Sequence, residues 1–383
     1  MGEYQYYEFT AVDRPLTGRE RAELRSLSTR ADITATSFVN TYEWGNFKGD
    51  PRTLMERYFD AHLYLANWGT RQLMLRLPKH VLDPATVAQY CQGDSASAWT
   101  TGKHIIIDLH DEDEDGIDEW DLDGHGLLTS IIPVRARLAA GDLRLLYLAW
   151  LRCVQSEEIA DDELEPPVLA GLGTLDAALT AVAEFLRIDP DLIAAAAAGS
   201  SPAASGEPTA TQLRTWVAGL PARDKDAILT DLITSGDSHL SSRLLRRYRD
   251  EHRTDTPTPA VARTAGQLLA TAAELRAGRE RRDAEQRDRD WIRRERSAAA
   301  ARQRHLDTLA VDQPAAWQRV DELIGTKKPR EYDTAVQLLV DLRDLAERDG
   351  DSTSFRNRLA ELRTVHARKP SLLERLNRTG LET

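Results

Sequence analysis

The stretch HLYLANWGTRQLMLRL, residues 62–77, predicts a β-hairpin and thereby the class of the fold. Two short apolar runs, His62–Trp68 and Arg71–Leu77, flank the dipeptide Gly69-Thr70. A two-residue connection that contains glycine, set between runs of this kind, is typical of a tight turn between antiparallel strands. The hairpin therefore places a β-sheet in the first third of the chain.

Further elements extend the sheet on both sides of this hairpin. Stretches rich in aromatic and β-branched residues predict strands at 4–12, 33–44 and 103–109. Thr17 and Glu20 form a capping box, and Asp50-Pro51 supplies an N-cap followed by a first-turn proline, so a helix is expected after each. The order of strands and helices favours an α+β domain with helices covering one face of the sheet.

The remainder of the chain has the periodicity of helices. Segment LRLLYLAWLRCV (143–154) is apolar nearly all round and predicts a buried helix, whereas GSSPAASGEPT (199–209) is typical of a linker. Two helices are expected to pack around apolar side chains that include Trp216, Leu229 and Leu232. We expect five segments: an α+β domain (1–200), a linker (201–210), a helical segment (211–260), a long Arg-rich helix (261–310) and a C-terminal helical bundle (311–383).

The composition excludes several classes of protein. Of 383 residues, 41% are hydrophobic and 29% are charged, which is typical of a globular chain rather than a disordered one. No apolar run reaches the ~18–20 residues that a membrane-spanning helix needs. Two cysteines, Cys91 and Cys153, are too few for a disulfide framework or a four-ligand zinc site. We expect a cytoplasmic protein without a membrane partner and without a cofactor.

Charge is distributed unevenly along the chain. The net charge is −12, yet residues 1–208 carry a balance of −17 and residues 209–383 one of +5. Five arginines at spacings of 3, 7, 4 and 3 lie on one face of the long helix: Arg279, Arg282, Arg289, Arg293 and Arg296. This row has three interpretations: a solvated face neutralised by neighbouring acids, a surface that docks on protein (including the chain's own acidic loop), or a nucleic-acid-binding row.

That acidic loop, residues 111–124, is a candidate cation site. Asp111, Asp113 and Asp115 alternate before Gly116 as in the start of an EF-hand loop. Position 12, which should be glutamate, is Leu122, so the EF-hand motif fails and a solvated loop is favoured.

Two other groups of residues suggest chemistry. His104 and Asp108 have the same parity on the strand at 103–109 and, with His110, could hold a metal or act as a general base. Trp44, Phe47 and Lys48 lie on a glycine-flanked loop and could stack a base or a sugar, although we favour packing of Trp44 into the core. No nucleophile motif and no P-loop accompanies either group.

Two stretches resemble known families. Residues 42–78, YEWGNFKGDPRTLMERYFDAHLYLANWGTRQLMLRLP, resemble a broadly distributed family of uncharacterised bacterial proteins. Residues 332–376, YDTAVQLLVDLRDLAERDGDSTSFRNRLAELRTVHARKPSLLERL, look like the helical tail of bacterial SWIM zinc-finger proteins. The SWIM zinc ligands, Cys-x-Cys followed by Cys-x-His, are absent, so the resemblance implies only a role in association.

We therefore expect a non-enzymatic interaction or adaptor protein that binds a protein partner, or a second copy of itself, through its helical C-terminal half. A nucleic-acid-binding protein that uses the arginine row is one alternative. A metal-dependent hydrolase centred on His104, Asp108 and His110 is the other.

Overall fold

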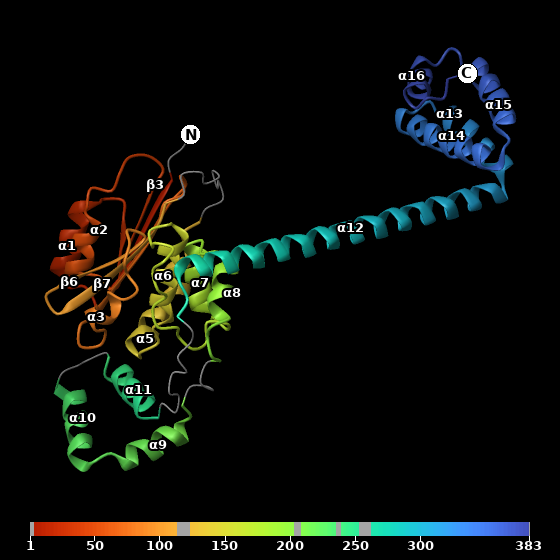
Figure 1. The fold of residues 1–383 in the computed structure, drawn as a ribbon. Helices are drawn as coiled ribbons and strands as arrows, with labels where there is room; N and C mark the ends of the chain where they lie inside the picture. Colours follow the sequence, from red (N-terminus) through yellow and green to blue (C-terminus); the bar gives the residue numbers. More distant parts are fainter. Residues whose placement is uncertain (1–3, 113–122, 203–207, 235–238, 253–261, 383) are drawn as a thin grey trace. The chain divides into compact units, whose positions relative to one another are not determined.

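The computed structural model describes residues 4–112, 123–202, 208–234, 239–252 and 262–382 (Figure 1). The chain divides into two compact units, residues 1–279 and residues 280–383. An α+β arrangement occupies the beginning of the chain and helices follow it, so the predicted fold class is confirmed. None of the helices in the described ranges combines the length with the hydrophobicity of a membrane-spanning segment.

Antiparallel strands of the first unit form one seven-stranded sheet with the order β2-β3-β1-β4-β5-β7-β6. The strands are β1 (Gln5–Thr10), β2 (Asp32–Ile33), β3 (Ser37–Tyr42), β4 (Ala61–Ala66), β5 (Arg71–Pro78), β6 (Ala96–Thr101) and β7 (His104–Asp111). The predicted hairpin is β4–β5, with Leu63 opposite Leu73. Its turn is closed by the Ala66 amide, which donates to the Thr70 carbonyl at 2.9 Å, and Gly69 supplies the positive φ of 100°. Strand β6 was not predicted, because its sequence ASAWTT has little hydrophobic patterning.

Helices cover both faces of the sheet, so the prediction of a single covered face is wrong. On one face, α1 (Gly18–Leu27) and α2 (Pro51–Arg57) pack over the aromatic side chains of β1 and β3. The other face is covered by the helices that follow the sheet, seen beside it in Figure 1: α4 (Leu127–Ile131), α5 (Pro133–Ala139), α6 (Arg144–Gln155), α7 (Ala177–Phe185) and α8 (Pro190–Ala197). A short helix, α3 (Pro84–Val87), lies between β5 and β6. The strict alternation of side chains along β5 and β7 allows both faces to be buried.

Helix α6 is the centre of the larger core. Every residue from Leu145 to Val154 is buried, Arg152 included, as a sequence that is apolar nearly all round predicted. Trp150 is among the largest side chains that are fully buried in the described residues. The capping box of α1 is also confirmed, since the Thr17 side chain accepts from the Glu20 amide and the Glu20 carboxylate accepts from the Thr17 amide.

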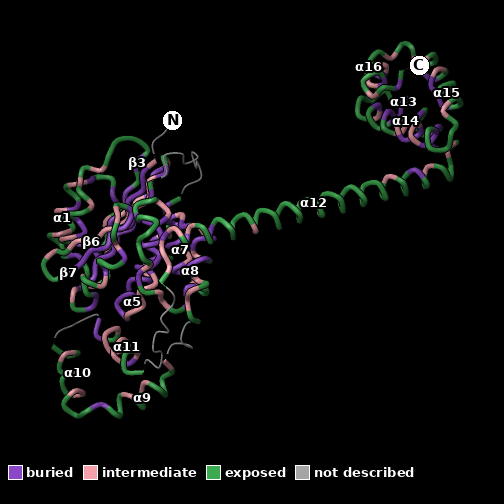
Figure 2. Tube along the Cα trace, in the orientation of Figure 1, coloured by how far each residue is buried: buried purple, intermediate pink, exposed green. Residues whose placement is uncertain are grey.

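Three helices after residue 208 bury very little. They are α9 (Ala210–Gly219), α10 (Ala222–Thr234) and α11 (Leu240–Glu251). Helices α9 and α10 contain no buried residue, and they are coloured almost wholly as exposed or intermediate in Figure 2. The expectation that Leu229 and Leu232 form a core is therefore wrong for this chain alone.

Helix α12 (Ala265–Val311) runs through the boundary between the units and confirms the predicted long helix. The second unit has its own core, formed by α13 (Gln313–Gly325), α14 (Pro329–Asp349), α15 (Ser352–Val365) and α16 (Pro370–Arg378). This four-helix core contains Trp317, Leu339 and Leu359, and it corresponds to the bundle that the sequence predicts.

Candidate functional site

Polar side chains gather on the sheet face that α1 and α2 cover only in part. Gln72 of β5 lies opposite His110 of β7 in the strand register, and Asp108 follows on the same face. The Gln72 amide nitrogen lies 2.9 Å from Asp108 Oδ1 and 3.0 Å from His110 Nε2, and His110 Nε2 lies 3.0 Å from the same carboxylate oxygen. The three side chains thus form one hydrogen-bonded group.

This group is satisfied in both protonation states of His110. Protonated Nε2 donates to Asp108, whereas deprotonated Nε2 accepts from the second amide hydrogen of Gln72. Burial alone would lower the pKa of His110, but the hydrogen bond to Asp108 and the negative charge of that carboxylate raise it. The arrangement can hold a proton on the sheet face, and Ser97 of β6 lies opposite Asp108 in the strand register.

His104 does not belong to this group, although its parity was predicted correctly. It lies six residues from His110 along β7, which corresponds to ~20 Å of extended strand. Burial and the neighbouring Arg76 charge lower the pKa of His104. The three residues of the predicted site therefore lie in two separate places, Asp108 with His110 and His104 towards the other end of β7. In the part of the chain that the structure describes, no cluster of three or more His, Cys, Asp or Glu is placed to hold a metal.

Asp111 is held by arginines instead of a cation. Its carboxylate accepts from Arg152 Nη2 at 2.7 Å and from Arg187 Nε. The parity of Asp111 places it on the opposite sheet face from Asp108 and His110. Asp113 and Asp115 lie outside the described residues, so the predicted cation site is represented by Asp111 alone, and that residue is neutralised by protein.

The loop after β3 separates the residues that the sequence grouped together. The ring of Phe47 packs 5.1 Å from Tyr7 and 5.6 Å from Phe38, so it belongs to the core. Trp44 is 65% exposed, with the guanidinium of Arg30 over its ring, and Lys48 is exposed. The favoured interpretation, packing of Trp44 into the core, is wrong: Phe47 packs and Trp44 does not.

The arginine row lies on α12 as its spacing predicted, but three of its members have acidic partners, one on α8 and two on α12 itself. Arg279 pairs with Asp191 at 2.6 Å, Arg289 pairs with Glu285 at 3.1 Å, and Arg293 pairs with Asp290. The charges of residues 279–296 are eight arginines and six acidic residues, a net +2. Arg282 and Arg296 are exposed on the same face. Interspersed charges of this kind are typical of a solvated helix.

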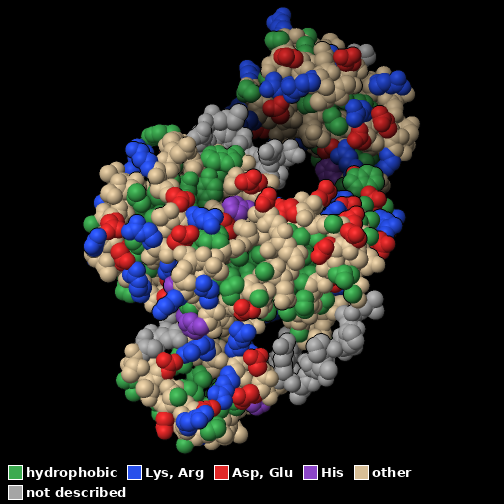
Figure 3. Space-filling view, turned by 60° about the vertical axis from the view of Figure 1, so that its left-hand side comes forward, with side chains coloured by type: hydrophobic (Ala, Val, Ile, Leu, Met, Phe, Trp, Pro, Cys, Tyr) green, Lys and Arg blue, Asp and Glu red, His purple; other side chains and the backbone are tan. Residues whose placement is uncertain are grey.

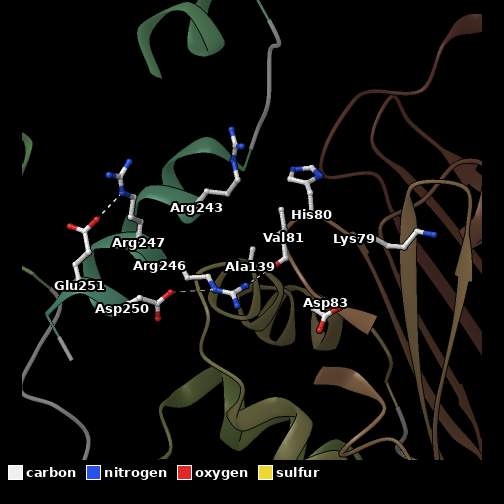
Figure 4. Close-up of a pocket in the computed structure, with 10 residues that line it drawn as sticks. All are labelled: Lys79, His80, Val81, Asp83, Ala139, Arg243, Arg246, Arg247, Asp250 and Glu251. Carbon is white, nitrogen blue, oxygen red and sulfur yellow. Dashed lines mark hydrogen bonds and ion pairs between the residues drawn. The ribbon is translucent and has the colours of Figure 1, made fainter. Parts of the chain in front are cut away.

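Arginines of α11 line a cavity of about 570 Å³ against the segment after β5 (Figure 4). Arg246 donates to the Val81 carbonyl at 2.8 Å, and Arg247 pairs with Glu251 at 2.8 Å. Its lining includes three acidic side chains, Asp83, Asp250 and Glu251, beside four lysine and arginine side chains. Arg246 thereby connects α11 to the segment that follows β5.

A buried charge network links distant parts of the first unit, and the sequence offers no signal for it. Arg76 donates to Asp60, and Arg135 of α5 donates to Asp13 at 2.6 and 2.9 Å. Burial alone would raise the pKa of Asp13, but hydrogen bonds from His239 and Arg135 lower it well below its usual range. Gln72 was likewise missed, since it becomes a partner of His110 only through strand pairing.

His62 lies at the centre of the sheet face that also carries the His110 group, and it is fully buried. Its Nδ1 donates to the Glu8 carbonyl at 2.9 Å, its ring stacks on Phe9 at 3.9 Å, and its Nε2 has no hydrogen-bond partner within the described residues. Burial lowers the pKa of His62 from 6.5 to about 4. Protonation therefore requires a charge to be placed in an aromatic core.

Acid is expected to destabilise the first unit through His62. The unfolded chain binds a proton at His62 with a pKa near 6.5 and the folded chain only at about 4, so the stabilisation is complete above pH 6.5 and is lost as the pH falls towards 4. Urea unfolding at pH 7 and pH 4.5 measures this loss. His62→Phe should lose less stability between the two pH values than the wild type, whereas the exposed control His125→Phe should lose the same amount as the wild type. Equal pH dependence of all three proteins would contradict the assignment.

The fold and these groups define an α+β domain with a polar sheet face. Helices that bury few residues follow it, and a four-helix core ends the described chain. No family model, no curated protein and no solved structure matches the chain. The resemblance of residues 332–376 to the SWIM tail therefore stays a prediction.

Proposed function

We propose that this protein is a non-enzymatic adaptor that binds a protein partner through its helical half. The observation that carries the proposal is an apolar face on α10. Leu229, Leu232 and Ile233 follow one another at spacings of three and one, the pattern of a core-facing helical stripe, yet they are 56%, 59% and 81% exposed. Hydrophobic side chains exposed together in this way are typical of protein interaction sites.

Other exposed side chains of these helices also fit a protein partner. Val217 of α9 is a further exposed apolar side chain, and the lower lobe of the space-filling view, which these helices form, mixes hydrophobic with charged side chains (Figure 3). Thr230 and Asp226, which flank the stripe on α10, are polar and exposed. An apolar centre with a polar rim is the usual anatomy of a protein interface.

Charge balance on α12 weighs against the nucleic-acid alternative. A net +2 over eighteen residues, with three of the five row arginines in ion pairs, provides few cations for phosphates. A gel shift at ~50 mM salt that disappears when Arg282, Arg289 and Arg293 are changed to alanine would favour nucleic acid over protein.

The double variant Leu229→Asp/Leu232→Asp is expected to lose the partner. Charges on these exposed positions disrupt an apolar interface but leave the folded chain intact, because the native side chains bury little in it. Affinity capture in mild salt, with quantitative mass spectrometry of wild type and variant, measures the loss.

A matched control is available in the second unit. Val311 and Val365 are 86% and 70% exposed, so Val311→Asp/Val365→Asp adds the same charge to apolar positions outside the proposed surface. Partners that survive the control and disappear with the α10 variant support the proposal. Capture profiles that are identical for all three proteins would refute it.

A further inference from the structure

The two edges of the seven-stranded sheet differ in length and in charge. The outermost strand on one side is β2, which has only two residues, one of them the exposed Asp32. On the other side the outermost strand is β6, whose six residues, ASAWTT, include neither a charged residue nor a proline. Short edge strands, charges and prolines are the usual means by which proteins prevent a further strand from pairing at a sheet edge. The β6 edge has none of these protections.

The hydrogen bonds of the sheet show which backbone groups of β6 point outward. The His110 amide donates to the Ser95 carbonyl at 2.8 Å. Residues that exchange hydrogen bonds recur at every second position of an antiparallel pair, so the odd-numbered residues of β6 bond to β7. The N–H and C=O groups of Ala98 and Thr100 consequently point away from the sheet, and both residues are exposed.

These outward groups form an unpaired section of the edge. Within the described residues, no hydrogen bond reaches the backbone N–H or C=O of Ala98 or Thr100 on this side. Ala96, the next even-numbered residue, is buried, and its carbonyl accepts from the Gly93 amide at 3.3 Å. The open section therefore offers two donors and two acceptors to an added strand.

The side chain between these positions, Trp99, is already held in place. Its Nε1 donates to Glu56 Oε1 at 2.8 Å, and the guanidinium of Arg52 lies 4.1 Å from the ring centroid. Arg52 also pairs with Glu56 at 3.6 Å, so the two charges beside the ring neutralise each other. A ring that is fixed before association loses little conformational entropy when another strand packs against it.

We infer that the β6 edge pairs with the β6 edge of a second copy of this chain, antiparallel and about a two-fold axis at Trp99. Ala98 of each copy then lies opposite Thr100 of the other, and the outward groups of the two strands form four hydrogen bonds between the copies. The two Trp99 side chains become a cross-strand aromatic pair, which stabilises a sheet. This self-association surface is additional to the proposed adaptor function and does not use the apolar stripe of α10.

Charges at the two ends of β6 favour this occupant and this direction. Asp94 precedes the strand and Lys103 follows it, and both are exposed. In the antiparallel register, Lys103 of each copy lies opposite Ser95, the neighbour of Asp94, in the other copy, so that opposite charges meet at both ends. Parallel pairing would bring like charges together. One strand pair is a small interface, so we expect a weak dimer that depends on concentration.

Hydrogen exchange followed by NMR, over an about hundredfold range of protein concentration, tests the interface. The amides of Ala98 and Thr100 should gain protection as the concentration rises, because only the dimer pairs them. The Ser97 and Trp99 amides should be protected throughout, since β7 pairs with them in each copy. A chain that stays monomeric in sedimentation velocity over this range, or edge amides whose exchange does not depend on concentration, would overturn the inference.

Ala98→Pro is expected to weaken the dimer by about tenfold or more, because it removes an outward N–H from each copy and obstructs the approach of the second strand. The sheet of each copy should remain intact, since that N–H takes no part in it, and circular dichroism checks this. The matched control Ala98→Thr keeps the N–H and should dimerise as the wild type does. Leu229→Asp/Leu232→Asp should also dimerise normally. A dimer that this α10 variant abolishes and Ala98→Pro does not would contradict the inference.

Charge reversal gives a test that does not depend on proline. Lys103→Glu and Asp94→Lys should each weaken the dimer, because each variant places like charges together at both ends of the paired strands. An equimolar mixture of the two variants should associate more tightly than either alone, since every end contact between them again joins opposite charges. A mixture that associates no better than its components would refute the proposed register.

Discussion

Replacing Arg76 by methionine is expected to lower the free energy of unfolding of the first unit by about 3–5 kcal/mol, because the change removes the nearest cation of a buried carboxylate and leaves only Arg135 Nη2 at 3.7 Å. Asp60 is fully buried, and its Oδ1 accepts from Arg76 Nε at 3.1 Å and from Nη2 at 2.8 Å. Arg76 Nη1 also donates to the Met55 carbonyl at 3.0 Å, at the end of α2. Methionine keeps the apolar stem but supplies none of these donors.

Hydrogen exchange of β1 and β5 amides, combined with urea unfolding, measures this loss for the first unit alone. The control is Arg19→Met, which removes an exposed i,i+4 pair with Glu23 and should cost no more than about 0.5 kcal/mol. An unfolding free energy of the Arg76 variant within about 1 kcal/mol of the wild type would contradict the role of this pair.

Leu339→Ala is expected to destabilise the second unit by about 2–5 kcal/mol, because it opens a cavity in a closed helical core. Leu339 is 0% exposed and lies in the cluster with Trp317 and Leu359. The same substitution on α10, Leu232→Ala, should cost less than about 0.5 kcal/mol, since that side chain is 59% exposed.

Exchange rates of amides in α14 and in α10 report the two effects separately. The cost of Leu232→Ala should rise towards that of Leu339→Ala when a partner covers the α10 face, because the Leu232 side chain is then packed. Similar losses for both variants in the isolated chain would show that α10 already packs against a core, and would remove the basis of the docking surface.

Local chemistry made several features predictable. The capping box of Thr17 and Glu20, the Gly69 turn and the apolar run of α6 depend on residues close in sequence, and each forms as expected. The position of His104 and Asp108 on one face of the strand could also be predicted, since side chains alternate between the two faces of a strand.

Convergence of distant residues was not predictable. His104 and His110 share a face but lie at opposite ends of β7, and the partner of His110 is Gln72, which strand pairing places beside it. Asp111 looked like a cation ligand until the fold placed Arg152 and Arg187 against it.

By itself the sequence determined most helices and strands of this protein, with β6 as an exception, because backbone propensity, capping and hydrophobic period act over a few residues. Only the tertiary structure decided which apolar stripes are covered. Leu232 and Leu339 both lie on apolar stripes of helices, but Leu339 is buried in the core of α13–α16 whereas Leu232 is 59% exposed. The burial of a side chain depends on which other elements pack against it, and the order of residues along the chain does not show this directly.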